Sequence, residues 1–295
     1  MLDIPADAQW SQKGVIVAGH VTNQLFLPYG LFIDDDNQMI VIADHDNNCI
    51  MQWKIDDPNG KVVVGGKGQG DQLDQLNGPT DVLIDKETDS LIISDSKNRR
   101  IVWWSCRNRT AQGEILIDNI ACHGLAIDDQ RHLYVSDVKK HEVRRYQLGG
   151  NMKNGTLVAG GNGYGSDLNQ LDFPTYIFVD RRQSVYVSDF HNHRVMKWNK
   201  DAKEGIIIAG GQGEGNALTQ ISDPSGLFVD ASGTLYAADL RYNRITRWPQ
   251  GAEQGNVIVG EGAELIWPMG VSFDRHGNHY VVDTGNVRVL RFSIQ

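Results

Sequence analysis

The sequence predicts an all-β fold, a six-bladed β-propeller built from four-stranded antiparallel blades. Three observations support this: one segment recurs six times along the 295 residues, its apolar runs have strand length, and the two chain ends together complete one repeat. A unit of about four strands cannot bury its faces alone, so six such units are expected to close into a ring.

The recurrent segment is centred on an aspartate that an aromatic residue follows nine positions later. The six copies read ADHDNNCIMQW, SDSKNRRIVWW, SDVKKHEVRRY, SDFHNHRVMKW, ADLRYNRITRW and VDTGNVRVLRF. Their aspartates are Asp44, Asp95, Asp137, Asp189, Asp239 and Asp283. A second motif, as in LPYGLFID and DPSGLFVD, lies fifteen or sixteen residues upstream, and the repeats are spaced by 42 to 52 residues.

Within each copy, short apolar runs such as LFI or IFV are followed by a polar turn and then by runs such as LIIS or VYVS. Gly, Asp, Asn and Pro separate these runs, and no long stretch has helical period. Each copy therefore predicts a blade of antiparallel strands.

The chain ends predict how the ring closes. The chain finishes with VRVLRFSIQ, the third strand of the last repeat, whereas GVIVAG at residues 14–19 matches the outer-strand segments KVVVGG and GIIIAGG. We expect this N-terminal strand to complete the last blade and so remove exposed strand edges. Residues 1–13 are then an N-terminal segment, and residues 14–295 form a single propeller.

These motifs resemble the NHL repeat. The resemblance lies in P-x-G-h-h-h-D, then Y-V-S/A-D-x-x-N-x-R-V/I, an aromatic and a G-x-h-h-x-A-G-G tail, and it covers nearly the whole chain from about Gly14. It implies a six-bladed propeller of NHL type. Such propellers serve many functions, so the fold does not select one.

The composition of the chain limits the classes of partner that it is expected to bind. The net charge of −9 argues against nucleic acid as a partner, because that binding relies on basic side chains that release counterions. No apolar run approaches the length of a membrane span, and the start of the chain lacks the pattern of a signal peptide. We expect a soluble monomer, either cytosolic or secreted with its signal removed.

Residues that recur are explained by the fold. The aspartate can accept backbone N–H bonds in a turn, and the arginine five residues later can bridge neighbouring blades through its forked donors. The six aromatic residues are expected to pack between blades. His193 is interpreted as a surface or interblade hydrogen-bonding residue, because one His-x-His pair with His191 is a weak metal signal.

Candidate functional residues lie at the end of the propeller that carries both P-x-G and S-D-x-x-N, called here the top. The residue after each proline is expected to point near the central channel. With His45 and Phe190, which follow two recurrent aspartates, these positions are the predicted ligand-binding residues: Tyr29, Thr80, Thr175, Ser225 and Met269. The sixth position is His123.

Blade three departs most from the repeat, since Cys122 replaces proline and His123 enters the ring. Asp81 in blade two and Tyr176 in blade four replace the glycine after P-x. A histidine and an aspartate within hydrogen-bond reach can act as a general base, so His123, Asp81 and Tyr176 are tentative catalytic residues. The alternative is drift in a degenerate repeat.

The six channel positions can be compared with those of two enzyme families that have similar propellers. Peptidyl-hydroxyglycine amidating lyases resemble NHL propellers and carry zinc-binding histidines after this proline in three alternate blades. Here that set is Tyr29, His123 and Ser225, so two ligands are missing and no metal ligand is assigned. Gluconolactonase-like propellers hold a divalent cation in the channel. The cofactor of this chain is unknown from the sequence, and a divalent cation in its central channel stays an alternative.

Loop lengths predict an uneven top face. Fourteen-residue connections precede blades two, four and five, and shorter ones precede the others, which favours a trough from the six/one side toward His123. The sequence thus favours a binding propeller that recognises a protein, peptide or small-molecule ligand on its top face. The alternatives are a lyase or hydrolase, possibly metal-assisted, that uses His123 at the channel mouth, and a purely structural scaffold.

Overall fold

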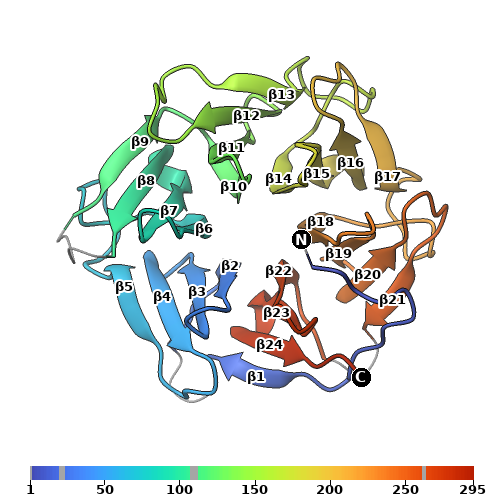
Figure 1. Cartoon of the computed structure of the whole chain (residues 1–295), viewed down its shortest axis with the longest axis horizontal. Helices are drawn as coiled ribbons and strands as arrows, with labels where there is room; N and C mark the ends of the chain where they lie inside the picture. Colours follow the sequence, from blue (N-terminus) through green and yellow to red (C-terminus); the bar gives the residue numbers. More distant parts are fainter. Residues whose placement is uncertain (1, 20–23, 107–111, 261–263) are drawn as a thin grey trace.

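The chain forms a ring of six four-stranded antiparallel sheets, shown by a computed structural model that describes residues 2–19, 24–106, 112–260 and 264–295 (Figure 1). This confirms the predicted six-bladed propeller. The helices of the described residues are single 3₁₀ turns. None of them is long and apolar enough to cross a membrane.

The first five blades are each made by one continuous stretch of chain, with the inner strand first. Blade one contains β2 (Pro28–Asp34), β3 (Met39–Asp44), β4 (Cys49–Lys54) and β5 (Lys61–Gly65). Blade two contains β6 (Pro79–Asp85), β7 (Ser90–Asp95), β8 (Arg100–Ser105) and β9 (Glu114–Asp118). Blade three contains β10 (Cys122–Ile127), β11 (His132–Asp137), β12 (Glu142–Gln147) and β13 (Thr156–Gly160).

Blades four and five repeat this order. Blade four contains β14 (Pro174–Val179), β15 (Val185–Asp189), β16 (Arg194–Trp198) and β17 (Ile206–Gly210). Blade five contains β18 (Pro224–Val229), β19 (Leu235–Asp239), β20 (Arg244–Trp248) and β21 (Asn256–Val259).

Blade six takes its outer strand from the other end of the chain. It contains β22 (Pro268–Phe273), β23 (His279–Asp283), β24 (Arg288–Phe292) and β1 (Val15–Ala18). Strand β1 pairs antiparallel with β24, with Val15 opposite Arg291, which confirms the predicted closure. The edge of β24 is therefore covered by a strand from the other end of the chain.

The N-terminal segment before β1 packs on blades five and six at the bottom end, opposite the recurrent aspartates. Trp10 is buried against Tyr236 and Phe273, and its indole Nε1 donates to the carbonyl of Gly277 at 2.9 Å. The carbonyl of Leu2 accepts a hydrogen bond from the backbone of Ala231. Leu2 and the C-terminal residue therefore both lie at the bottom (Figure 1).

The core lies between blades rather than within them. Trp104 of blade two clusters with Val41 and Ile50 of blade one, and Trp53 of blade one clusters with Tyr280 and Val282 of blade six. All six recurrent aromatic residues are buried: Trp53, Trp104, Tyr146, Trp198, Trp248 and Phe292. Their predicted packing role is confirmed.

The recurrent aspartate and arginine form a buried hydrogen-bonded pair, called here the Asp–Arg clasp. In blade two, Asp95 accepts the backbone N–H of Asn77 at 2.7 Å and the Nε of Arg100 at 2.7 Å. The other guanidinium nitrogens donate to the carbonyls of Asp71, Gln72 and Gln75. The clasp thus holds the loop that connects blade one to blade two.

His193 lies in a second set of contacts between blades. Its Nδ1 accepts a hydrogen bond from the backbone N–H of Asp223 at 3.3 Å, and His141 does the same for Phe173 at 3.2 Å. A backbone N–H only donates, so both rings carry their proton on Nε2 when neutral. The interblade interpretation of His193 is confirmed.

Candidate functional site

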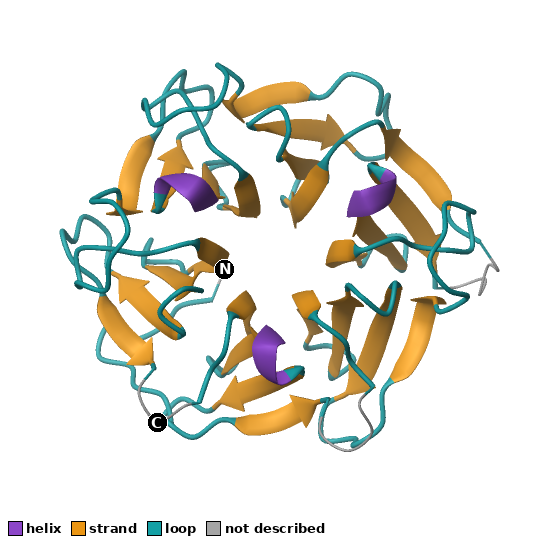
Figure 2. Cartoon of the chain, turned by 180° about the vertical axis from the view of Figure 1, so that it is seen from behind, coloured by secondary structure: helices purple, strands orange, loops and turns teal. Residues whose placement is uncertain are grey.

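The top end of the propeller carries the turns that follow the recurrent aspartates, and Figure 2 looks onto this end. Three of these turns are 3₁₀ helices, η1 (Ser96–Asn98), η2 (Phe190–Asn192) and η3 (Thr284–Asn286). The inner strands begin at the same end with the residues Pro28, Pro79, Cys122, Pro174, Pro224 and Pro268. This end therefore collects the predicted site residues around the axis.

Five of those residues form one contact group, called here the axial cluster: Tyr29, His45, His123, Tyr176 and Met269. The Tyr29 ring stacks on His45 with centroids 4.4 Å apart and lies 6.3 Å from His123. His123 meets Tyr176 edge to face at 5.1 Å, and the Tyr176 hydroxyl lies 3.9 Å from the Met269 sulfur. Blades one and three, and blades four and six, are not neighbours, so these contacts reach over part of the central channel.

The axial cluster has two layers. His123 and Tyr176 are buried, with 8% and 6% of their surface exposed, whereas Tyr29, His45 and Met269 are partly exposed. The second group therefore offers the accessible surface, and the first supports it. An aromatic face with its edge held by neighbours is a suitable platform for a flat or ring-shaped ligand.

The surroundings of His123 disfavour its charged form. Burial, and then the nearby His45, lower its pKa to about 3. Its Nδ1 is buried and has no hydrogen-bond partner among the described residues. A buried ring nitrogen without a partner is costly and is a candidate contact for a ligand.

Asp81 does not pair with His123. Its two carboxylate oxygens accept the backbone N–H groups of Val82 and Leu125, each at 2.9 Å, so it links blade two to blade three. Within the described ranges no hydrogen bond joins it to His123. Burial raises the pKa of Asp81 to about 7.

Tyr176 contacts His123, and burial, with Asp81 next, raises the pKa of its phenol well above the usual value. The structure thus brings His123 and Tyr176 together, while the Asp81 carboxylate is directed at the backbone of β10. The three tentative catalytic residues are close in space but do not form a relay of hydrogen bonds in the described structure.

Thr80, Thr175 and Ser225 link neighbouring inner strands. Their hydroxyls donate to the next blade: Thr80 to the carbonyl of His123 at 2.8 Å, Thr175 to that of Pro224 at 3.4 Å, and Ser225 to that of Pro268 at 2.8 Å. Their hydroxyls are therefore engaged within the ring, and a ligand would have to displace these bonds to reach them.

Phe190 lies outside the axial cluster. It belongs to an aromatic group in blade four, where Phe173 is 6.1 Å from Phe190 and stacks on His191 at 4.9 Å. The sequence analysis did not single out Phe173, although its place directly before Pro174 was a usable signal.

No group of three or more His, Cys, Asp or Glu side chains in the described part of the chain is placed to hold a metal ion. His45 is instead paired with Asp46, whose Oδ1 lies 2.6 Å from its Nδ1.

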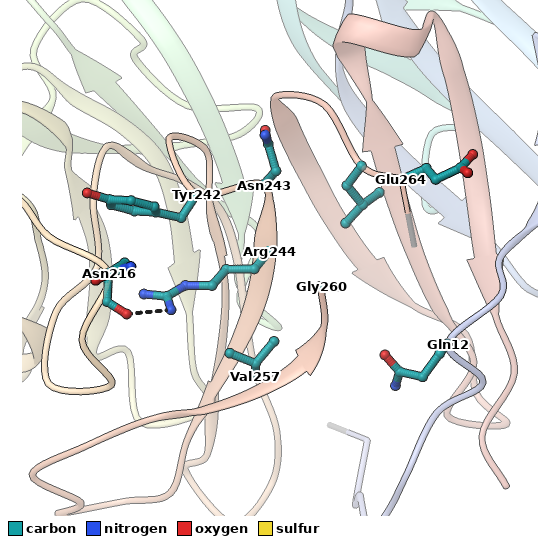
Figure 3. A pocket seen from close by; sticks show the side chains of 9 residues that line it. Gln12, Asn216, Tyr242, Asn243, Arg244, Val257, Gly260 and Glu264 are labelled. Carbon is teal, nitrogen blue, oxygen red and sulfur yellow. Dashed lines mark hydrogen bonds between the residues drawn. The ribbon is translucent and has the colours of Figure 1, made fainter. Parts of the chain in front are cut away.

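A hollow of about 600 Å³ lies between blades five and six (Figure 3). The Arg244 side chain extends across it, and its Nη1 donates to the carbonyl of Asn216 at 2.8 Å (Figure 3). Since Arg244 is the clasp arginine of blade five, we interpret this hollow as part of the scaffold. The trough expected across the top stays a prediction.

Comparison with known proteins gives the fold. No protein-family model and no curated protein sequence matches the chain. An auxiliary nutrient binding protein from Bacteroides thetaiotaomicron matches 99% of this chain and 74% of its own, at 13% identity and a TM-score of 0.72. A chain of a nidogen/laminin complex matches 93% of this chain and 87% of its own, at 14% identity and a TM-score of 0.65.

A virginiamycin B lyase from Staphylococcus aureus is also similar. It matches 97% of this chain and 88% of its own, at 12% identity and a TM-score of 0.61. The three proteins have different roles, and at these identities the likeness concerns the backbone. This chain is a six-bladed β-propeller.

Proposed function

We propose that the chain is a binding propeller that holds a small, uncharged, ring-bearing ligand on the accessible layer of the axial cluster. The observation that carries this proposal is the stacked, partly exposed pair Tyr29–His45 above the neutral, unpartnered His123. Sugar and base rings pack on aromatic faces, and a neutral imidazole can form a hydrogen bond without preferring a charge. From its repeat motifs, we infer that the propeller is of NHL type.

Binding fits the site better than catalysis by His123. A general base works best when its pKa lies near the working pH, and a pKa of about 3 makes His123 a weak proton acceptor at neutral pH. The Tyr29–His123 and Tyr176–Met269 contacts also place side chains of non-adjacent blades against one another at this end. A fold neighbour described as a nutrient binding protein agrees with this role.

The test is a binding screen with methyl glucoside, methyl galactoside and adenosine, followed by calorimetry and thermal unfolding. At least one probe should bind, and Tyr29→Ala should weaken it at least tenfold because the platform is removed. Tyr164→Ala is the matched control, since Tyr164 is 73% exposed and lies outside the axial cluster. If none of the probes binds, or if Tyr29→Ala binds like the parent protein, the proposal fails.

The second candidate is an enzyme at the channel mouth. The observation in its favour is Asp81, because a carboxyl pKa of about 7 is suited to general acid–base catalysis near neutral pH. One fold neighbour is an inactive virginiamycin B lyase solved with quinupristin. Incubation with quinupristin, followed by chromatography, and elemental mass spectrometry of the purified protein would test this. Under the binding proposal, quinupristin stays intact.

A further inference from the structure

Four of the six blades bury the same polar group at the bottom of the inner strand. An aspartate directly after this strand accepts a hydrogen bond from a tyrosine on the second strand, and a basic residue of the third strand lies opposite that tyrosine. The aspartate–tyrosine pairs are Asp128–Tyr134, Asp180–Tyr186, Asp230–Tyr236 and Asp274–Tyr280, at 3.1 to 3.3 Å. In blade four the Lys197 ammonium lies 5.0 Å from the centre of the Tyr186 ring.

Blade one keeps the aspartate and lacks both partners. Val41 stands where the tyrosine is expected, and Gln52 stands where the basic residue is expected. Asp34 is nevertheless 3% exposed, and its Oδ2 accepts a hydrogen bond from Asn37 at 2.7 Å.

The Oδ1 atom of Asp34 has no hydrogen-bond partner among the described residues. The Lys86 ammonium lies 3.4 Å away, but that side chain is 52% exposed and is bound to Asp36 at 2.5 Å. Blade two also lacks the tyrosine, yet its Asp85 is paired with Thr88 and Arg131. Asp34 therefore differs from the equivalent aspartates of blades two to six.

A cavity opens beside Asp34 in the cleft between blades one and two, called here the one–two cleft. Its volume is about 570 Å³, and its lining includes Asp34, Gln52, Val62, Ile84 and Trp104. The corresponding cleft between blades four and five, lined by Tyr186, Lys197 and Trp248 among others, measures about 270 Å³. The larger volume accompanies the loss of the tyrosine and lysine.

We propose that the one–two cleft binds a small arylalkylamine, a molecule that joins an aromatic ring to an ammonium group. The ammonium would donate to Asp34 Oδ1, and the ring would lie against Val62, Ile84 and Trp104. In blades three to six, a tyrosine and a basic side chain lie next to the buried aspartate. The ligand would supply an aromatic ring and a cation in their place. A charge-assisted hydrogen bond favours the cation, and packing against an indole favours the ring.

The long-range field supports the same ligand class. A chain of net charge −9 attracts cations more than anions, which helps a small amine reach a recessed carboxylate. The site is independent of the axial cluster, since it lies at the interface of β5 with blade two and shares no residue with it. Failure of one proposal therefore leaves the other standing.

Tyramine is the probe, with 4-ethylphenol as its uncharged counterpart. Calorimetry should show one site for tyramine and at least tenfold weaker binding of 4-ethylphenol. Asp34→Asn keeps the shape and removes the charge, so it should weaken tyramine at least tenfold. Val41→Tyr/Gln52→Lys rebuilds the blade-four arrangement and should abolish tyramine binding while raising the thermal midpoint.

The reverse exchange is the matched variant. Tyr186→Val/Lys197→Gln should open the four–five cleft beside Asp180 and raise the tyramine stoichiometry from one to two. The proposal is overturned if tyramine does not bind, if 4-ethylphenol binds equally well, or if Val41→Tyr/Gln52→Lys binds tyramine like the parent. The Val41→Tyr/Gln52→Lys variant is expected to fold, because it adds the tyrosine and the basic residue that four other blades already contain.

Discussion

Blades four and six carry the same clasp in different surroundings. Asp189–Arg194 and Asp283–Arg288 are both joined at 2.7 Å, but the Arg194 side chain is 4% exposed and the Arg288 side chain is 21% exposed. Blade four is one continuous stretch, whereas blade six borrows β1. The repeat thus fixes the geometry of a clasp, whereas the exposure of the clasp arginine differs from blade to blade.

The two blades also differ at the start of their second strand. Val185 occupies this position in blade four, and His279 occupies it in blade six. His279 is fully buried and stacks on Phe273 at 4.6 Å, and neither ring nitrogen has a hydrogen-bond partner among the described residues. Blade six therefore contains a polar group that destabilises it, at the place where the chain ends meet.

Removal of residues 2–18 should have the largest effect, because it deletes β1 and the buried Trp10. Loss of a buried tryptophan alone costs ~3–5 kcal/mol, and the exposed edge of β24 adds to it. We expect the truncated chain to lose its cooperative urea transition. The Trp10→Ala variant should lose less unfolding free energy than the truncated chain, because it keeps β1. An unchanged transition midpoint in the truncated chain would show that blade six does not need the borrowed strand.

Removing one clasp aspartate should distinguish the two blades. Asp189→Ala leaves Arg194 buried without its partner and should lower the free energy of unfolding by ~3–5 kcal/mol. Asp283→Ala leaves Arg288 closer to water, so we expect about half that loss. Urea denaturation measures both, and equal losses would mean that burial does not separate the two clasps.

Acid should affect blade six through His279. Burial lowers the pKa of His279 to about 3, below the ~6.5 of an unfolded chain. Between these values the unfolded state binds the extra proton, so stability falls as the pH falls, by ~1.4 kcal/mol per pH unit.

His279→Leu removes this contribution. The difference in unfolding free energy between His279→Leu and the parent protein should therefore grow by ~3 kcal/mol from pH 7.5 to pH 4. Urea titrations at several pH values measure it. A difference that stays constant with pH would show that His279 does not titrate on unfolding.

At neutral pH the same exchange should have the smallest effect. Leucine already occupies the equivalent position in blade five, as Leu235. The exchange at position 279 removes two ring nitrogens that have no hydrogen-bond partner among the described residues. We expect His279→Leu to stabilise the chain by ~1 kcal/mol, and Val185→His to destabilise blade four. Thermal unfolding of both variants at pH 7.5 checks this. If His279→Leu is less stable than the parent, packing around the imidazole outweighs its missing hydrogen bonds.

The scaffold could be predicted because its determinants repeat. The GVIVAG segment indicated closure by β1, and the recurrent aspartates indicated their backbone N–H bonds, although their direct pairing with the arginines was not predicted. The interblade role of His193 was predicted from its position in the repeat. Six copies of one pattern allow each position to be compared with its five equivalents. A residue type that recurs at equivalent positions indicates a structural role and not a chance occurrence.

The candidate site was harder to predict because it depends on side-chain reach and on local backbone shape. Thr80 and Ser225 follow proline as Tyr29 does, but their short side chains hydrogen-bond to the adjacent strand. Tyr176 reaches Met269 across the axis, although simple alternation along a strand does not place it there. A β-bulge between Pro174 and Ile177 changes that alternation. The one–two cleft was not predicted, because the volume left between two blades depends on side-chain packing.

The packing of both chain ends at the bottom has a practical consequence for how this protein can be presented. A linker fused before Leu2 or after Gln295 leaves from the end opposite the axial cluster. On a sensor surface or a bead, such a linker would point every copy the same way, with Tyr29 and His45 facing the solution. Immobilisation through either end should therefore preserve access to the proposed ligand platform.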